Sequence, residues 1–139
     1  MPARLLADVD ALLMDILRAA LGEDVTVVEV LPADWAGDYP VVVASRLPGG
    51  AAVHPEFLDR ALCQVDVYDD DRTGALDLAA SCRTALYEAW KHQTVFPNGS
   101  VSQYSETAAP AALAIPNQPA GETFVPATYG LLISPPLVP

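Results

Sequence analysis

Residues 61–68 alternate between two sets of side chains, and this alternation constrains the fold more than any other feature of the sequence. The two sets are Ala61, Cys63, Val65 and Val67, and Leu62, Gln64, Asp66 and Tyr68. Because successive side chains of a strand point to opposite faces, the pattern predicts a strand with one packed face and one largely wet face. The sheet that contains it is therefore expected to be covered on one side.

Two amphipathic helices are predicted, one on each side of this strand in the chain. Apolar residues recur at three- and four-residue spacing over residues 5–21, up to Gly22, and Pro2 suits the first turn. A second apolar stripe follows residues 69–71 and runs to about Gln93. We interpret the polar face of the first helix as solvated or as a subunit contact; it carries Arg4, Asp8, Asp15 and Arg18.

The remaining strands are predicted from β-branched runs and from the distribution of proline. Most of the 13 prolines fall beyond residue 96, where no amphipathic helix can be drawn. The predicted strands are residues 25–31, 39–47, 61–68, 101–107 and 123–133, with a linker at 110–121 and an arm at 135–139. The fold class is α+β: one domain over residues 1–139, with a small mixed or antiparallel sheet of about four to five strands backed by two helices. Residues 1–96 form its α/β core part, and residues 97–139 form an extended, Pro-rich C-terminal region.

Residues 48–57 are too long and too rich in Gly and Pro to be a tight hairpin, so they are predicted to be a loop. Loops of this length usually carry function or become ordered on a partner. The chain of 139 residues is 52% apolar, which is enough for one core without disulfides or metal. Its net charge of −11 excludes binding of DNA or RNA by charge neutralisation.

Cysteine spacing and apolar run length exclude further classes. Cys63 and Cys82 form no CxxC motif and are expected to be buried, inert thiols. No apolar run reaches membrane-spanning length, and acidic residues interrupt the N-terminal stretch that would otherwise resemble a signal peptide. We expect a protein made in a cytoplasm, with no membrane contact.

The densest acidic cluster is Asp69, Asp70 and Asp71, with Asp66 just upstream. Carboxylates at a strand-to-helix turn usually cap the helix, and the spacing lacks the glycine and glutamate of a calcium loop, so we favour a cap over a metal site. The alternative is a small metal-dependent hydrolase that uses these four aspartates and His54. No nucleophile elbow, Walker loop or dinucleotide fingerprint is present, and no cofactor is expected.

The order of elements resembles the tail terminator, or tail completion protein, of long-tailed bacteriophages, especially those of actinobacterial hosts. The resemblance covers nearly the whole chain and depends on the order of motifs that are individually weak. These motifs are residues 8–13, 39–43, Gly49-Gly50, 63–68, Asp71-Arg72 leading to Ala75, Leu78-Ala79, Arg83, Leu86, and 129–132.

This resemblance implies a structural virion protein without catalytic residues, assembled in the host bacterial cytoplasm. It implies a homohexameric ring on the finished tail tube, which stops polymerisation of the major tail tube protein and joins the head-side connector or stopper. Genomic DNA then passes through the lumen without specific binding. A head-side neck stopper or adaptor is the closest alternative, and an acidic mimic of nucleic acid is a third reading that the apolar C-terminal part argues against.

A closed ring needs apolar surface beyond the core, because its contacts join two different faces of each subunit. The loop at residues 49–57 and the C-terminal arm are expected to become ordered only against neighbours. Candidate interface residues are Gly49, Gly50, Val53, His54, Phe57, Tyr104, Phe124 and Leu137, and Tyr39 is a further candidate. Asp69, Asp70 and Asp71 are candidates for the lumen, where a lack of Lys and Arg would let DNA slide.

Overall fold

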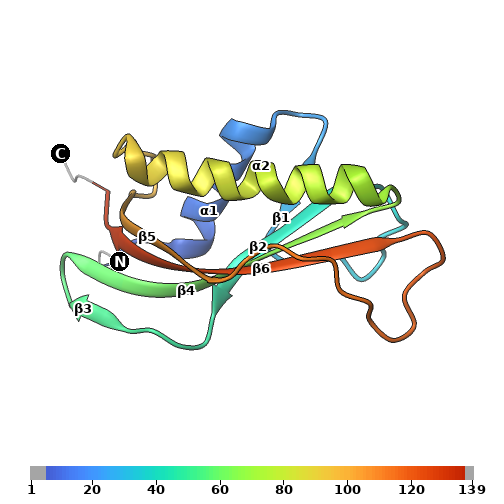
Figure 1. Cartoon of the computed structure of the whole chain (residues 1–139). Coiled ribbons are helices and arrows are strands. Elements are labelled where there is room, and N and C mark those ends of the chain that lie inside the picture. The colour runs from blue at the N-terminus through green and yellow to red at the C-terminus, as the bar shows by residue number, and fades with distance from the viewer. Residues whose placement is uncertain (1–5, 137–139) are drawn as a thin grey trace.

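The computed structural model describes residues 6–136 and contains two helices and six strands (Figure 1). In chain order the elements are α1 (Val9–Leu21), β1 (Thr26–Val28), β2 (Val41–Leu47), β3 (Ala52–His54), β4 (Leu58–Asp69), α2 (Arg72–Lys91), β5 (Ser100–Ala108) and β6 (Thr123–Ser134). No helix of this region is long and apolar enough to cross a membrane.

The strands form one mixed sheet in the order β1-β2-β4-β6-β5, and β3 pairs with the start of β4. Only β1 and β2 are parallel; the other pairs are antiparallel. Both helices lie on the same face of the sheet, as Figure 1 shows. The α+β class with two helices behind a sheet is confirmed.

The alternation in β4 gives the two faces that it predicts. Ala61, Cys63, Val65 and Val67 are buried beneath the helices, while the side chains between them are half-buried on the other face. From the helix side, Leu12, Leu13 and Leu17 of α1 are fully buried in the same core. One hydrophobic core therefore lies between the helices and one face of the sheet.

The N-terminal helix starts later than its apolar pattern predicts. It begins at Val9, with Asp8 as the N-cap whose carboxylate accepts from Ala11 N; Leu6 precedes it outside the helix, and Pro2 lies outside the described residues. Arg18 is exposed, as the interpretation of the polar face of this helix as solvated requires, whereas Asp15 is partly buried and holds another segment of the chain, which corrects that interpretation for Asp15. Arg4 lies outside the described residues. The Asp15 carboxylate accepts from Asn98 at 2.8 Å, and Arg18 donates to the Val27 carbonyl at 2.9 Å.

The region beyond residue 97 belongs to the sheet and forms no separate Pro-rich extension in the part that the structure describes. Strand β6 lies between β4 and β5 and pairs with β4 over nearly its whole length. Proline is tolerated at Pro126 because β5 pairs with β6 only from Thr128 onward, so this side of β6 is an edge where no ladder donor is needed. Residues 137–139 of the expected arm lie outside the described chain.

The segment predicted as the loop 48–57 contains the additional strand β3. Ala52 pairs with Asp59 and His54 pairs with Leu58, and Phe57 N donates to the His54 carbonyl at 3.2 Å across the connecting turn. This turn closes a hairpin within a single chain. The expectation of a loop that is ordered only by neighbours is therefore wrong for these residues, because β4 begins three residues earlier than its alternation and supplies the pairing edge.

Candidate assembly surfaces

The tip of the β3–β4 hairpin exposes apolar side chains to solvent. Val53 is 54% exposed and Phe57 is 58% exposed. The Phe57 ring stacks on His54 with centroids 4.6 Å apart, and Glu56 N donates to His54 Nδ1 at 3.2 Å. We call residues 53–57 the hairpin tip. Clustered exposed apolar side chains of this kind mark interaction surfaces.

Gly49 and Gly50 shape the approach to this hairpin. Gly50 has φ +74°, and a Cβ there would lie 2.3 Å from the Arg60 carbonyl oxygen. Only glycine fits this crossing, because any side chain would collide with the β4 backbone. Gly49 has φ +122°, a backbone conformation that other residues rarely adopt. Both glycines, predicted as interface residues, therefore have a role within the chain; that they also contact a neighbour stays a prediction.

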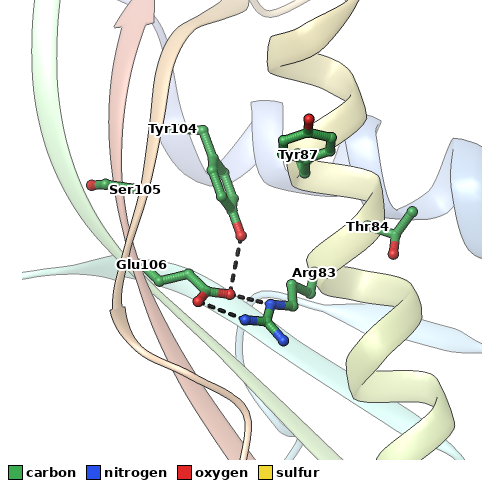
Figure 2. Close-up of a pocket in the computed structure, with 6 residues that line it drawn as sticks. All are labelled: Arg83, Thr84, Tyr87, Tyr104, Ser105 and Glu106. Atoms are coloured by element: carbon green, nitrogen blue, oxygen red, sulfur yellow. Dashed lines mark hydrogen bonds and ion pairs between the residues drawn. The ribbon is translucent and has the colours of Figure 1, made fainter.

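A second surface is the groove between α2 and the edge strand β5, which we call the β5 groove (Figure 2). Its volume is about 390 Å³, and its lining residues are Arg83, Thr84, Tyr87, Tyr104, Ser105 and Glu106. Arg83 binds Glu106 through two nitrogens, with Nη2 2.8 Å from Oε2, and Tyr104 donates to the same carboxylate at 3.2 Å. The hydrogen bonds from Arg83 lower the pKa of Glu106.

Sequence reasoning named only Tyr104 among the interface candidates in this groove. Arg83 entered through the family resemblance, and Tyr87 and Glu106 were missed. Helix α2 and strand β5 meet only in the tertiary structure, so no local spacing links these residues. The one signal in the sequence for this groove is Tyr87, an aromatic residue that lies off the apolar stripe of the second helix. In the structure it is 41% exposed.

Phe124 is not a free surface residue, which corrects its prediction as an interface contact. It is only 8% exposed and stacks on Tyr68 with centroids 4.8 Å apart. Trp35 lies next to Tyr68 and Tyr39, so the connection between β1 and β2 covers this end of the sheet. Leu137, the remaining interface candidate, lies outside the described residues.

The acidic turn between β4 and α2 caps the helix, as predicted. Asp71 is the N-cap, and its carboxylate accepts from Gly74 N at 3.0 Å. Asp69 accepts from Asp70 N at 2.7 Å. Burial and the hydrogen bond to Glu122 raise the pKa of Tyr39 to about 12, and the charges of Asp70 and Asp69 add to this shift. Carboxylates from separate segments therefore gather at this end of the sheet.

The aspartates and His54 do not converge as a metal-dependent hydrolase requires. His54 and Asp69 lie at opposite ends of β4, a strand of 12 residues that spans roughly 40 Å. Asp66 accepts from Gln64 at 2.8 Å on the open face of the sheet. Within residues 6–136, no three His, Cys, Asp or Glu side chains are grouped to hold a metal ion. The constellation proposed for that alternative is therefore wrong.

Cys63 and Cys82 are both buried and both free, as their positions on the packed strand face and helix stripe predict. Burial raises the pKa of each thiol to about 12. A thiol with such a pKa carries almost no thiolate at neutral pH, and thiolate is the reactive form.

A small α+β domain with an apolar hairpin tip and an open edge groove is typical of a subunit that is completed by neighbours. The family model described as "Phage tail termination protein" matches residues 5–138, and the chain belongs to this family. It is a tail termination protein, a structural component of the virion tail, as the sequence resemblance predicted.

The structure is similar to a chain of a solved assembly described as "Virion of native gene transfer agent (GTA) particle". The TM-score is 0.55 at 19% sequence identity, and the match covers 85% of this chain and 84% of that one. At this identity the similarity shows a shared fold. No curated protein sequence matches the chain.

Proposed function

We propose that this tail termination protein forms a closed homohexameric ring on the end of the tail tube. The ring stops addition of the major tail tube protein and presents a surface for the head-side connector. The observation that carries this proposal is the family match over residues 5–138. The motif resemblance extends the proposal to phages of actinobacterial hosts.

Charge supports passage of DNA through such a ring. The chain has 18 Asp plus Glu against 7 Lys plus Arg. Several of the arginines are occupied within the subunit, among them Arg46 on Asp59 and Arg83 on Glu106. A lumen poor in free cations would release DNA readily, since each phosphate contact adds affinity. We propose that Asp69, Asp70 and Asp71 face the lumen.

Imaging of the purified protein tests the ring. A six-fold ring with a hole wide enough for duplex DNA is expected in negative stain. Added to polymerising tail tube protein, the ring is expected to stop growth and leave tubes of fixed length. A protein that stays monomeric at high concentration and leaves tube growth unchanged would contradict the proposal.

The lumen assignment has its own test. Asp69 and Asp70 are replaced by Lys in one variant, with Glu23 and Asp24 replaced in a matched control of equal charge change; Asp71 is kept because it caps α2. Only the first variant is expected to retain duplex DNA in a salt-dependent manner. Equal retention by both variants, or an assembled ring with a basic inner wall, overturns the assignment.

The alternative function is that of a neck stopper, which binds on the head side of the virion. It predicts binding to portal-bearing heads, whereas a terminator binds tail tubes that lack heads. Co-sedimentation with each particle separates the two. Binding to heads alone would move the protein to the neck while leaving its structural role intact.

A further inference from the structure

We propose that the hairpin tip of one copy inserts into the β5 groove of the next copy, and that this contact closes the ring. The inference rests on the proposed ring and names the contact that builds it. It follows from where the two surfaces lie, from their shapes, and from their charges.

The two surfaces lie on opposite edges of the sheet. Strand β6 pairs with β4 along its length, so β3 occupies the other side of β4, next to β2. The β5 groove lies at the far edge, beyond β6. Figure 1 shows β3 at the lower left of the view, well away from α2. A contact between unlike surfaces on opposite edges repeats in one direction, which is how cyclic rings close.

The shapes match because the tip is apolar and the groove has an aromatic wall. Phe57 and Val53 project from the hairpin with more than half of their surface exposed. The groove has a volume of about 390 Å³, which is large enough for a phenyl ring to lie against Tyr87 and Tyr104. These two rings already touch edge to face, with centroids 5.8 Å apart and planes at 82°, and form one aromatic wall. Rings of this kind favour edge-to-face contact with a further aromatic side chain.

The charges also match. Arg83 binds Glu106 through Nε and Nη2, so its half-exposed guanidinium keeps Nη1 as a donor for a second carboxylate. The tip presents Glu56, and His54, whose Nδ1 accepts from Glu56 N. Since Nδ1 accepts from Glu56 N, the other ring nitrogen, Nε2, is the one that can donate to Glu106. Insertion therefore pairs Glu56 with Arg83 and His54 with Glu106.

Cysteine cross-linking tests the contact directly. In a chain carrying both Phe57→Cys and Tyr87→Cys, oxidation is expected to give a ladder of disulfide-linked multimers that ends at the closed ring. The two positions lie on opposite sheet edges of one copy, so a bond within a chain is not expected. The native thiols of Cys63 and Cys82 are buried, so they are not expected to form disulfides in this experiment. Each single variant is the matched control and is expected to give no ladder.

Two charged variants give a second readout. Phe57→Asp and Tyr87→Asp change exposed side chains, so both are expected to fold and to stay monomeric. An equimolar mixture is expected to form dimers and nothing larger, because the intact tip of one variant can enter the intact groove of the other only once. Val30→Asp, at a position 76% exposed and outside both surfaces, is expected to assemble normally.

The outcomes separate this inference from the proposed function. A ring that forms in the unmodified protein without a ladder in the double-cysteine variant overturns the tip-to-groove contact and leaves the ring standing. Normal assembly of both aspartate variants does the same. An unmodified protein that never forms a ring overturns the proposed function, and the inference with it.

Discussion

Arg46 forms a two-point ion pair with Asp59, with Nη1 2.5 Å from Oδ2 and Nη2 2.9 Å from Oδ1. The carboxylate is buried beneath the helices, and the guanidinium is partly exposed. This pair neutralises the single buried charged side chain among the described residues. It lies where β2, β4 and the start of α1 meet, since Arg46 N also donates to Asp10.

Removing Arg46 alone is expected to destabilise the protein by about 3 kcal/mol, because it leaves a buried carboxylate without a partner. The variant Arg46→Met keeps the length of the side chain. The double variant Arg46→Met with Asp59→Leu is expected to recover most of the loss, since the buried charge is gone. Urea unfolding measures both. A double variant less stable than the single one would show that the pair itself stabilises the fold.

Tyr129→Phe is expected to leave stability unchanged or raise it by up to about 1 kcal/mol, because the buried hydroxyl of Tyr129 has no hydrogen-bond partner within the described chain. Tyr39→Phe is the matched control. It removes a hydrogen bond of 2.5 Å to Glu122 and is expected to cost about 1.5 kcal/mol or more. Chemical denaturation compares the two, and a loss from Tyr129→Phe as large as that from Tyr39→Phe would contradict the account.

The two thiols are expected to resist a thiol reagent such as a disulfide-bearing chromophore at pH 8 while the protein is folded. Both are buried, and burial raises the pKa of each to about 12. In denaturant, two thiols per chain are expected to react at once. Rapid labelling of either cysteine under native conditions would show that α2 opens from the sheet.

Asp71→Ala is expected to destabilise the protein by about 1 kcal/mol through loss of the α2 cap. Asp71→Asn is expected to retain most of that stability, because its side-chain oxygen still accepts from Gly74 N. Thermal unfolding checks both variants. The cap is independent of any lumen role, so Asp71→Asn is also the variant in which to measure DNA retention without loss of fold.

Stability is expected to fall as the pH rises above about 10. Burial, aided by neighbouring carboxylates, raises the pKa of Tyr39 and of Tyr104 to about 12 in the folded protein, whereas a tyrosine in an unfolded chain ionises near 10. The unfolded state therefore loses its protons first, so this contribution is complete below pH 10 and is lost between pH 10 and 12. Denaturation followed across this range measures the decline. Tyr104→Phe is expected to make it shallower, and an unchanged slope would argue against the raised pKa.

The local patterns predicted most elements because each depends on the nearest neighbours in the chain. Strand β6 starts where its β-branched run starts, and Asp71 caps α2 as its place before the helix indicates. The features that the local patterns did not predict have physical causes. Strand β3 carries no alternation of buried and exposed residues and exists only because β4 extends to Leu58 and offers it an edge. Asp15 of α1 is predicted to be solvated, but Asn98, 83 residues away in the chain, donates to its carboxylate.

The sequence by itself determined the α+β class, the capped second helix, the inert cysteines and the resemblance to tail termination proteins. These depend on periodicity, on residue type and on motif order, which are all properties of the residue order and need no knowledge of the fold. The tertiary structure alone decided which candidate surfaces are free. It buried Phe124 against Tyr68, exposed Phe57 at a hairpin tip, and brought Arg83 to Glu106 across a groove. Exposure depends on what the rest of the chain packs against a residue, and that is known only once the sheet and its helices are assembled.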